Sequence, residues 1–421
     1  MNRMTAINAA EILCVGTELL LGQIVNTNAA WLARELSLLG INSYYQTVVG
    51  DNADRLQAVL QLAADRSDLI ILTGGLGPTQ DDLTMAGAAR FAGLQLHLHE
   101  PSRAAIQDYF HSIGRREVTA NNWKQALLPD GAIVLPNHNG TAPGAILETV
   151  RAGRPVRLIL LPGPPSEMQL MFRESVAPYL ESQSANRLRH LFVRLIGIGE
   201  SAAETRLLDL IENQRNPTLA PYASEGEVLF RITQSVSQPD EPDRTQDLLA
   251  EVRRRLGEYI YEVGPRSMPE VLKDLLTERN QTIGFAESCT GGMVSAAITD
   301  LPGSSAVFRG SVVAYDNAVK MAILHVPSDI INQAGAVSES CAIAMATGCR
   351  DILNTDLAVA VTGIAGPDGG SPAKPVGLVW LAVASAAGTQ TRRLQLGGNR
   401  ARIRKVATLN ALDLARRCLL S

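Results

Sequence analysis

Short apolar runs alternate with amphipathic segments along the first part of the chain. The apolar runs have the length of buried strands, and the segments between them carry leucines at helical spacing. Strands are predicted at 11–16, 42–49, 68–73 and 156–163, and helices at 26–39, 52–64 and 165–180. This alternation predicts a mainly parallel sheet with helices on both faces.

The pattern changes after this region and then returns. Between 185 and 264, strands and helices alternate without a glycine-rich strand end, which indicates a small α+β module. The segment GPRSMP at 264–269 is typical of a linker. We therefore expect an α/β fold class, in which two domains with mainly parallel sheets, 1–180 and 266–421, are joined by a small α+β domain over 181–265.

The segment AESCTGG at 286–292 follows an apolar strand, and open α/β sheets bind ligands at such strand ends. Ser288, Cys289 and Thr290 are candidate nucleophiles. Gly291 and Gly292 offer backbone N–H groups at a helix start, where an anion or oxyanion could be held. A helix cap by Ser288 or Thr290 is the structural alternative.

A serine hydroxyl needs a base, and the chain offers few candidates. Five of the six histidines precede residue 200, and His325 has no neighbouring carboxylate pattern that suggests a triad. The segment VVAYDNAVK ends a strand at Tyr315 and places Lys320 five residues later. Burial disfavours a charged amine, so Lys320 is the candidate base, and Tyr315 could relay the proton or orient Lys320. A solvated helix lysine is the alternative.

Two further segments could bind a substrate. The loop TGIAGPDGG at 362–370 supplies Thr362 and glycines such as Gly363 and Gly366, which allow close approach of a ligand. The segment GGNRARIRKVA opens a helix with Arg400 and other basic residues. Basic residues oppose the dipole at a helix start, which hints at an anionic partner such as a phosphate. A solvated charge run is the alternative.

The segments ESCTGG, YDNAVK, GAVSE, TGIAGPDGG and KPVGLVW together resemble the nicotinamide-nucleotide amidase domain of the CinA family. The resemblance covers 266–421 and implies a Ser288–Tyr315–Lys320 arrangement. It implies hydrolysis of nicotinamide mononucleotide to the nicotinate form and ammonia without a required cofactor, and a homodimer. The substrate-binding residues that we expect are Thr290, Gly291, Gly292, Thr362, Gly363, Gly366 and Arg400.

Three segments near the N-terminus, GTELLLGQIVNTN, TGGLGPTQDDLT and LPGPPSEM, lie at predicted strand ends. Their glycine turns would expose backbone donors for a phosphate or pyrophosphate. Asp81 and Asp82 stand beside these donors, and carboxylates beside a phosphate site usually hold a divalent metal. Capping of the next helix by the two aspartates is the alternative.

These three segments resemble the molybdopterin-binding-like domain at the front of full-length CinA proteins, over residues 8–175. Relatives with this fold bind molybdopterin, and in full-length CinA proteins the domain is associated with metal-dependent hydrolysis of ADP-ribose. The expected nucleotide site comprises Glu18, Asn26, Gly74, Gly75, Gly77, Asp82, Gly163 and Glu167, with Asp81 and Asp82 as metal ligands. A pterin- or nucleotide-binding module that only regulates the amidase is the alternative.

Composition narrows the classes of partner. A net charge of −4 and 4% aromatic residues disfavour nucleic-acid binding, and with it a role as a competence or DNA-repair accessory. No apolar run reaches about 18 residues, and the first ten residues lack the apolar core of a signal peptide. Five widely spaced cysteines argue against a disulfide framework or a zinc site. We expect a cytoplasmic enzyme of pyridine-nucleotide salvage that binds no membrane.

Overall fold

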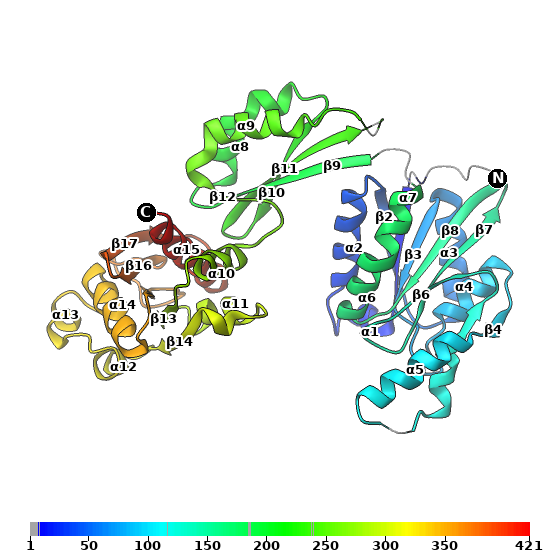
Figure 1. Cartoon of the computed structure of the whole chain (residues 1–421), viewed down its shortest axis with the longest axis horizontal. Helices are drawn as coiled ribbons and strands as arrows, with labels where there is room; N and C mark the ends of the chain where they lie inside the picture. The colour runs from blue at the N-terminus through cyan, green and yellow to red at the C-terminus, as the bar shows by residue number, and fades with distance from the viewer. Residues whose placement is uncertain (1–6, 8, 116, 184–186, 237, 239) are drawn as a thin grey trace. The chain divides into compact units, whose positions relative to one another are not determined.

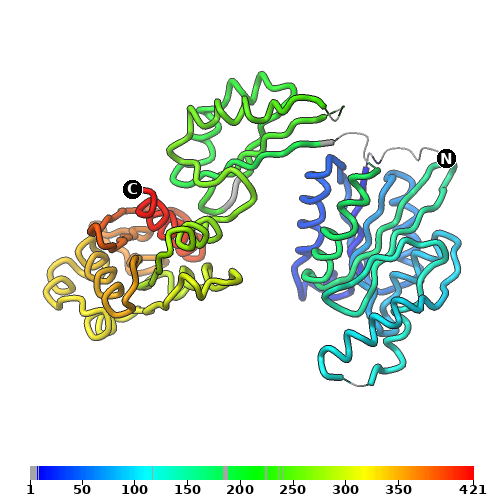
Figure 2. The backbone as a smooth tube through the Cα atoms, viewed as in Figure 1, coloured from blue at the N-terminus to red at the C-terminus, as the bar shows by residue number. Residues whose placement is uncertain are grey.

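The structure, a computed structural model, describes residues 7, 9–115, 117–183, 187–236, 238 and 240–421. The chain forms two compact units (Figures 1 and 2). The first comprises the described residues up to Arg189 together with 235–241, and the second comprises 190–234 and 242–421. Within the described residues, no helix has the length and apolar character needed to cross a membrane.

A six-stranded sheet with the order β2-β1-β3-β8-β7-β6 forms the centre of the first unit. Its strands are β1 (Ala9–Val15), β2 (Asn42–Val49), β3 (Leu69–Thr73), β6 (Ile133–Leu135), β7 (Gly144–Arg151) and β8 (Arg154–Leu161). The four strands β2, β1, β3 and β8 run parallel, whereas β7 and β6 are antiparallel to their neighbours.

Helices cover both faces of this sheet, as the alternation of apolar runs predicts. In β1, Ile12 and Cys14 face one core cluster while Leu13 and Val15 face the other, because successive side chains of a strand point to opposite faces. The elements that pack around the sheet are α1 (Thr17–Leu20), α2 (Thr27–Leu38), α3 (Ala53–Arg66), α4 (Thr84–Ala92), β4 (Leu96–Leu98), α5 (Glu100–Ser112), η1 (Ala120–Ala126), β5 (Leu127–Pro129), α6 (Pro165–Met171), η2 (Phe172–Val176) and α7 (Ala177–Gln183).

The second unit begins with a small four-stranded sheet with the order β10-β11-β9-β12. The pairs β10–β11 and β9–β12 are antiparallel. The elements of this module are β9 (Arg187–Leu195), α8 (Glu200–Glu212), β10 (Thr218–Ser224), β11 (Glu227–Val236), α9 (Thr245–Leu256), η3 (Gly257–Tyr259) and β12 (Ile260–Val263).

The last part of the second unit is a five-stranded sheet with the order β14-β13-β15-β16-β17. Its strands are β13 (Ile283–Glu287), β14 (Phe308–Val313), β15 (Leu357–Gly363), β16 (Leu378–Ser385) and β17 (Gly388–Gln395). The flanking elements are α10 (Met268–Glu278), α11 (Met293–Thr299), η4 (Ser304–Ala306), α12 (Asn317–Ala322), α13 (Ser328–Gln333), α14 (Glu339–Leu353) and α15 (Arg400–Leu420). Helix α14 packs on one face, whereas α10, α11 and α15 pack on the other (Figure 1).

The predicted fold class is confirmed, but the two large sheets are mixed rather than uniformly parallel. The strands that end at the candidate sites, namely β1, β3 and β8 and then β13, β14 and β15, are parallel. The antiparallel strands β7, β6, β16 and β17 extend one edge of each sheet. The pattern of apolar residues indicates that a segment is a strand but carries no information about its direction. The antiparallel strands could therefore not be predicted.

Candidate active sites

Three parallel strands of the C-terminal sheet end at the same edge. In the register of the sheet, the last residue of β13 lies level with Val313 of β14 and Val361 of β15. The residues that follow these positions, Ser288, Ala314 and Thr362, therefore meet at one edge of the sheet. This is the edge at which open α/β sheets bind ligands.

Lys320 lies beside this edge and is buried, with 1% of its surface exposed. Its Nζ donates a hydrogen bond of 3.0 Å to the carbonyl oxygen of Tyr315. Burial lowers the pKa of Lys320, and the nearby groups of Cys341, Asp316 and Cys289 only partly oppose this effect. The alternative of a solvated helix lysine is therefore wrong.

The hydroxyl groups of the predicted nucleophile turn do not cap helix α11. The N-cap residue of α11 is Gly292, and a glycine has no side chain that could cap a helix. Ser288 is 8% exposed, and the Oγ1 atom of Thr290 is buried without a hydrogen-bond partner among the described residues. Neither hydroxyl caps the helix, and the capping alternative is wrong.

Sequence reasoning missed Glu287, which performs the capping role. Its fully buried carboxylate accepts hydrogen bonds from the backbone N–H groups of Gly292 (2.9 Å), Val294 (3.1 Å) and Ser295 (2.9 Å), and from the Ser295 hydroxyl (2.6 Å). The sequence did contain a signal for this role, namely an acidic residue between an apolar strand and the start of a helix.

The prediction that Gly291 and Gly292 supply free N–H donors is wrong. The Gly292 N–H donates to Glu287, and the Gly291 N–H donates to the Ser288 carbonyl at 3.1 Å. The two glycines are needed for a different reason, since their φ angles of +59° and +97° lie in the left-handed region.

Arg400 and Arg404, on the first turns of α15, both reach this edge. Arg400 donates to the Tyr315 hydroxyl at 2.9 Å and to the Gly366 carbonyl at 2.7 Å. Arg404 donates to the carbonyl oxygens of Cys289 at 3.1 Å and Thr290 at 2.7 Å. The structure thus brings the predicted Arg400 to the site and adds Arg404 to it.

The remaining predicted binding residues have local structural partners. The Thr362 hydroxyl donates to the Ala336 carbonyl at 2.7 Å. A Cβ atom at Gly363 would lie 2.7 Å from a methyl group of Val379, and one at Gly366 would lie 2.6 Å from a methyl group of Val376. These two glycines make room for the neighbouring chain, which the pattern of glycines alone could not distinguish from room for a ligand.

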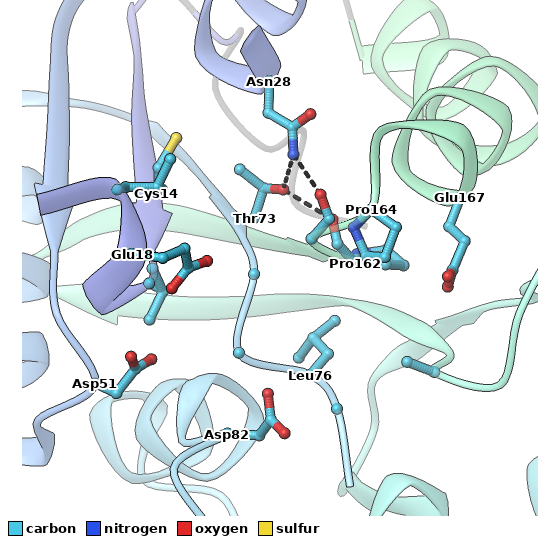
Figure 3. Close-up of a pocket in the computed structure, with 18 of the residues that line it drawn as sticks. Cys14, Glu18, Asn28, Asp51, Thr73, Leu76, Asp82, Pro162, Pro164 and Glu167 are labelled. Carbon is cyan, nitrogen blue, oxygen red and sulfur yellow. Dashed lines mark hydrogen bonds between the residues drawn. The ribbon is translucent and has the colours of Figure 1, made fainter. Parts of the chain in front are cut away.

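In the first unit, the ends of β1, β3 and β8 surround a cavity of about 720 Å³ (Figure 3). Every residue predicted for this site lies in the lining of the cavity. These residues are Glu18, Asn26, Gly74, Gly75, Gly77, Asp81, Asp82, Gly163 and Glu167. Strand ends far apart in the sequence therefore converge as a parallel sheet requires.

The two predicted metal ligands are engaged with Thr79. Asp82 accepts a hydrogen bond of 2.8 Å from the Thr79 N–H, and Asp81 accepts one from the Thr79 hydroxyl, which lowers the pKa of Asp81. Leu83 is the N-cap residue of α4, so neither aspartate caps that helix. No three His, Cys, Asp or Glu side chains in the described part of the chain converge as a metal site. A divalent cation here would need oxygens from a bound phosphate and from water.

Glu167 and Asn28 line the opposite side of the cavity, where Asn28 was not predicted. Burial raises the pKa of Glu167, whose carboxylate accepts a hydrogen bond of 2.7 Å from Asn137. Asn28 donates to the Gly163 carbonyl at 2.7 Å and to the Thr73 hydroxyl at 3.1 Å (Figure 3). The predicted Asn26 instead caps α2 through its side chain.

Comparison with known proteins places these sites in a family context. Residues 11–182 match the model of a probable molybdopterin binding domain, residues 190–261 that of the damage-inducible protein CinA KH domain, and residues 265–419 that of the CinA C-terminal domain. CinA-like proteins of Dictyoglomus thermophilum, Dictyoglomus turgidum and Kosmotoga olearia are each 49% identical to this chain. Each match covers 98% of this chain and 99% of the relative.

The two buried threonines of the C-terminal site allow a matched test of these contacts. We expect Thr362→Val to lower the free energy of unfolding by about 1–3 kcal/mol, because it leaves the Ala336 carbonyl without its donor. Thr290→Val should change it by less than about 1 kcal/mol, because the Thr290 hydroxyl has no partner to lose. Urea unfolding of both variants measures this difference, and equal destabilisation by the two substitutions would contradict the assignment.

Proposed function

This chain belongs to the CinA-like family over 98% of its length, and on that premise we propose that its C-terminal domain hydrolyses the amide of nicotinamide mononucleotide. The products are nicotinate mononucleotide and ammonia. Ser288 is the nucleophile, Lys320 is the general base, and Tyr315 orients the lysine through its carbonyl oxygen.

The observation that carries this proposal is the burial of Lys320 beside the strand edge that bears Ser288. A lysine that is 1% exposed, with a lowered pKa, is uncharged more readily than a surface lysine and can accept a proton. A serine hydroxyl becomes an effective nucleophile only when such a base removes its proton.

The proposed reaction proceeds through an acyl-enzyme. Neutral Lys320 accepts the Ser288 proton while Oγ bonds to the carboxamide carbon, and the carbonyl electron pair moves to its oxygen. The lysine then returns the proton to the amide nitrogen, the C–N bond breaks, and ammonia leaves. Lys320 then accepts a proton from a water molecule, whose oxygen bonds to the acyl carbon. The bond from that carbon to Oγ breaks, and the lysine returns the proton to the Ser288 oxygen.

Arg400 supports a phosphate-bearing substrate. A guanidinium group has five N–H donors, and hydrogen bonds to Tyr315 and Gly366 use two of them. The remaining donors can bind phosphate oxygens in a bidentate manner. This arrangement favours a nucleotide over free nicotinamide.

We expect Ser288→Ala and Lys320→Met each to reduce ammonia release from nicotinamide mononucleotide by about 10³-fold or more, because each removes one half of the nucleophile–base pair. The assay contains EDTA, so that metal-dependent hydrolysis does not contribute. Lys273→Met, on α10, is the matched control and should retain wild-type rates. A folded wild-type protein that releases no ammonia would refute the proposed activity.

The rate should rise with pH up to the pKa of Lys320 and then level off. The base acts in its uncharged form, and burial lowers its pKa, so the midpoint should fall below the ordinary value for lysine. A pH profile of kcat/KM measures the midpoint, with circular dichroism at each pH to verify folding. A midpoint at the ordinary lysine value would argue against Lys320 as the base.

The cavity of about 720 Å³ in the first unit favours a second activity, metal-dependent hydrolysis of ADP-ribose. Asp82 and Glu167 line it from two sides, and the turns at Gly74–Gly77 border it. Oxygens of Asp81 and Asp82, together with those of the pyrophosphate, would hold the cation.

We expect AMP release from ADP-ribose with Mg²⁺, Mn²⁺ or Co²⁺, and a loss of about 10²-fold or more in Asp82→Asn, because the metal loses a carboxylate ligand. Asp65→Asn, on the exposed face of α3, is the control. Tight binding of ADP-ribose without any AMP release would instead identify a non-catalytic binding module.

A further inference from the structure

Hydrogen bonds to its carbonyl oxygens hold the turn after β13 in place. The Ser288 carbonyl accepts the Gly291 N–H at 3.1 Å. The guanidinium group of Arg404 donates from Nε to the Cys289 carbonyl at 3.1 Å and from its terminal nitrogen to the Thr290 carbonyl at 2.7 Å. Three consecutive peptide groups are therefore fixed through their oxygens.

Fixing a carbonyl oxygen also fixes the N–H group of the same peptide. These peptide bonds are trans, so each N–H points away from the carbonyl oxygen of the preceding residue. The Cys289 N–H thus points away from the Ser288–Gly291 hydrogen bond, and the Thr290 N–H points away from Arg404. Among the described residues, neither N–H has a hydrogen-bond acceptor outside its own residue.

The other N–H groups of this segment are occupied. Ser288 donates to the Val361 carbonyl at 2.9 Å, Gly291 donates to the Ser288 carbonyl, and Gly292 donates to the Glu287 carboxylate. The two N–H groups without an acceptor on another residue directly follow the nucleophile. In α/β-hydrolases the N–H of the residue after the nucleophile is an oxyanion-hole donor.

We propose that the backbone N–H groups of Cys289 and Thr290 form the oxyanion hole and that Arg404 is the positioning residue that aligns them. This inference rests on the proposed amidase function. The negative charge that develops on the substrate carbonyl oxygen is stabilised by these two donors, while Arg404 acts from behind the turn and does not touch the substrate. Oxyanion donors are effective when their orientation is fixed before the reaction.

The test compares Arg404→Met and Arg404→Lys with the matched control Arg279→Met. Arg279 is exposed at the end of α10, and no side-chain hydrogen bond or ion pair of Arg279 occurs within the described residues. We expect Arg404→Met to lower kcat by about 10- to 100-fold and to change KM by less than about threefold, because misaligned donors weaken transition-state binding. Arg404→Lys, which retains one donor group, should fall between Arg404→Met and the wild type.

Two further readouts separate positioning from a general loss of structure. Hydrogen exchange of a peptide spanning 286–295 should accelerate in Arg404→Met, whereas exchange of the β15 and β16 peptides should not change. The midpoint of the pH profile should stay at the wild-type value, because Lys320 sets it and Arg404 does not act on the base.

The outcomes are distinguishable. Wild-type kcat in Arg404→Met, or a raised KM with unchanged kcat, would overturn the inference while the amidase activity stands. A shifted pH midpoint would also overturn it, since Arg404 would then act on the base. Absence of ammonia release from the wild type would refute the proposed function and, with it, the oxyanion hole, whatever the exchange rates show.

Discussion

A single buried carboxylate determines the geometry of the C-terminal site. Glu287 is the last residue of the central strand β13, and its four hydrogen bonds tie that strand to the first turn of α11. An ionised carboxylate is costly to bury unless donors surround it, and here three backbone N–H groups and one hydroxyl do so. Because these donors are consumed, the helix start cannot bind an anion. Within the described part of this connection, Cys289 and Thr290 are the residues whose N–H groups have no acceptor on another residue.

The two candidate sites lie at equivalent edges of their sheets but differ in how the space there is filled. Both lie where parallel strands end, which is where an α/β sheet leaves side chains from distant segments together. In the first unit, glycine turns leave an open cavity large enough for a nucleotide. In the second unit, the edge is filled by a buried lysine and by arginines that bind backbone oxygens. Open space favours binding a large ligand, whereas a filled edge favours holding a few reactive groups in place.

Much of this arrangement could be predicted from the sequence, and the exceptions have physical causes. Strand β2 was predicted over the residues that the structure shows, because its aromatic and β-branched residues lie between Gly40 and Gly50. Lys320 was predicted as a buried base because the chain offers few other candidates, and its burial is confirmed. The donor role of Gly291 and Gly292 was wrong, since the partners of an N–H group depend on where Glu287 folds back. Asn28 was missed although it also lines the cavity, because its bond to the Gly163 carbonyl depends on tertiary structure, whereas Asn26 caps α2 locally.

Contacts between the middle module and the last domain constrain whether the last domain could exist as a separate protein. The hairpin between β10 and β11 reaches helix α15, where Glu225 forms an ion pair with Lys405 at 3.2 Å. A Cβ atom at Gly226 would lie 2.9 Å from a methyl group of Leu409 and 3.3 Å from one of Val406. A free-standing protein that begins at α10 would expose these two apolar positions to water. In evolutionary terms, separation of the last domain from the middle module should therefore be accompanied by polar substitutions on this face of α15.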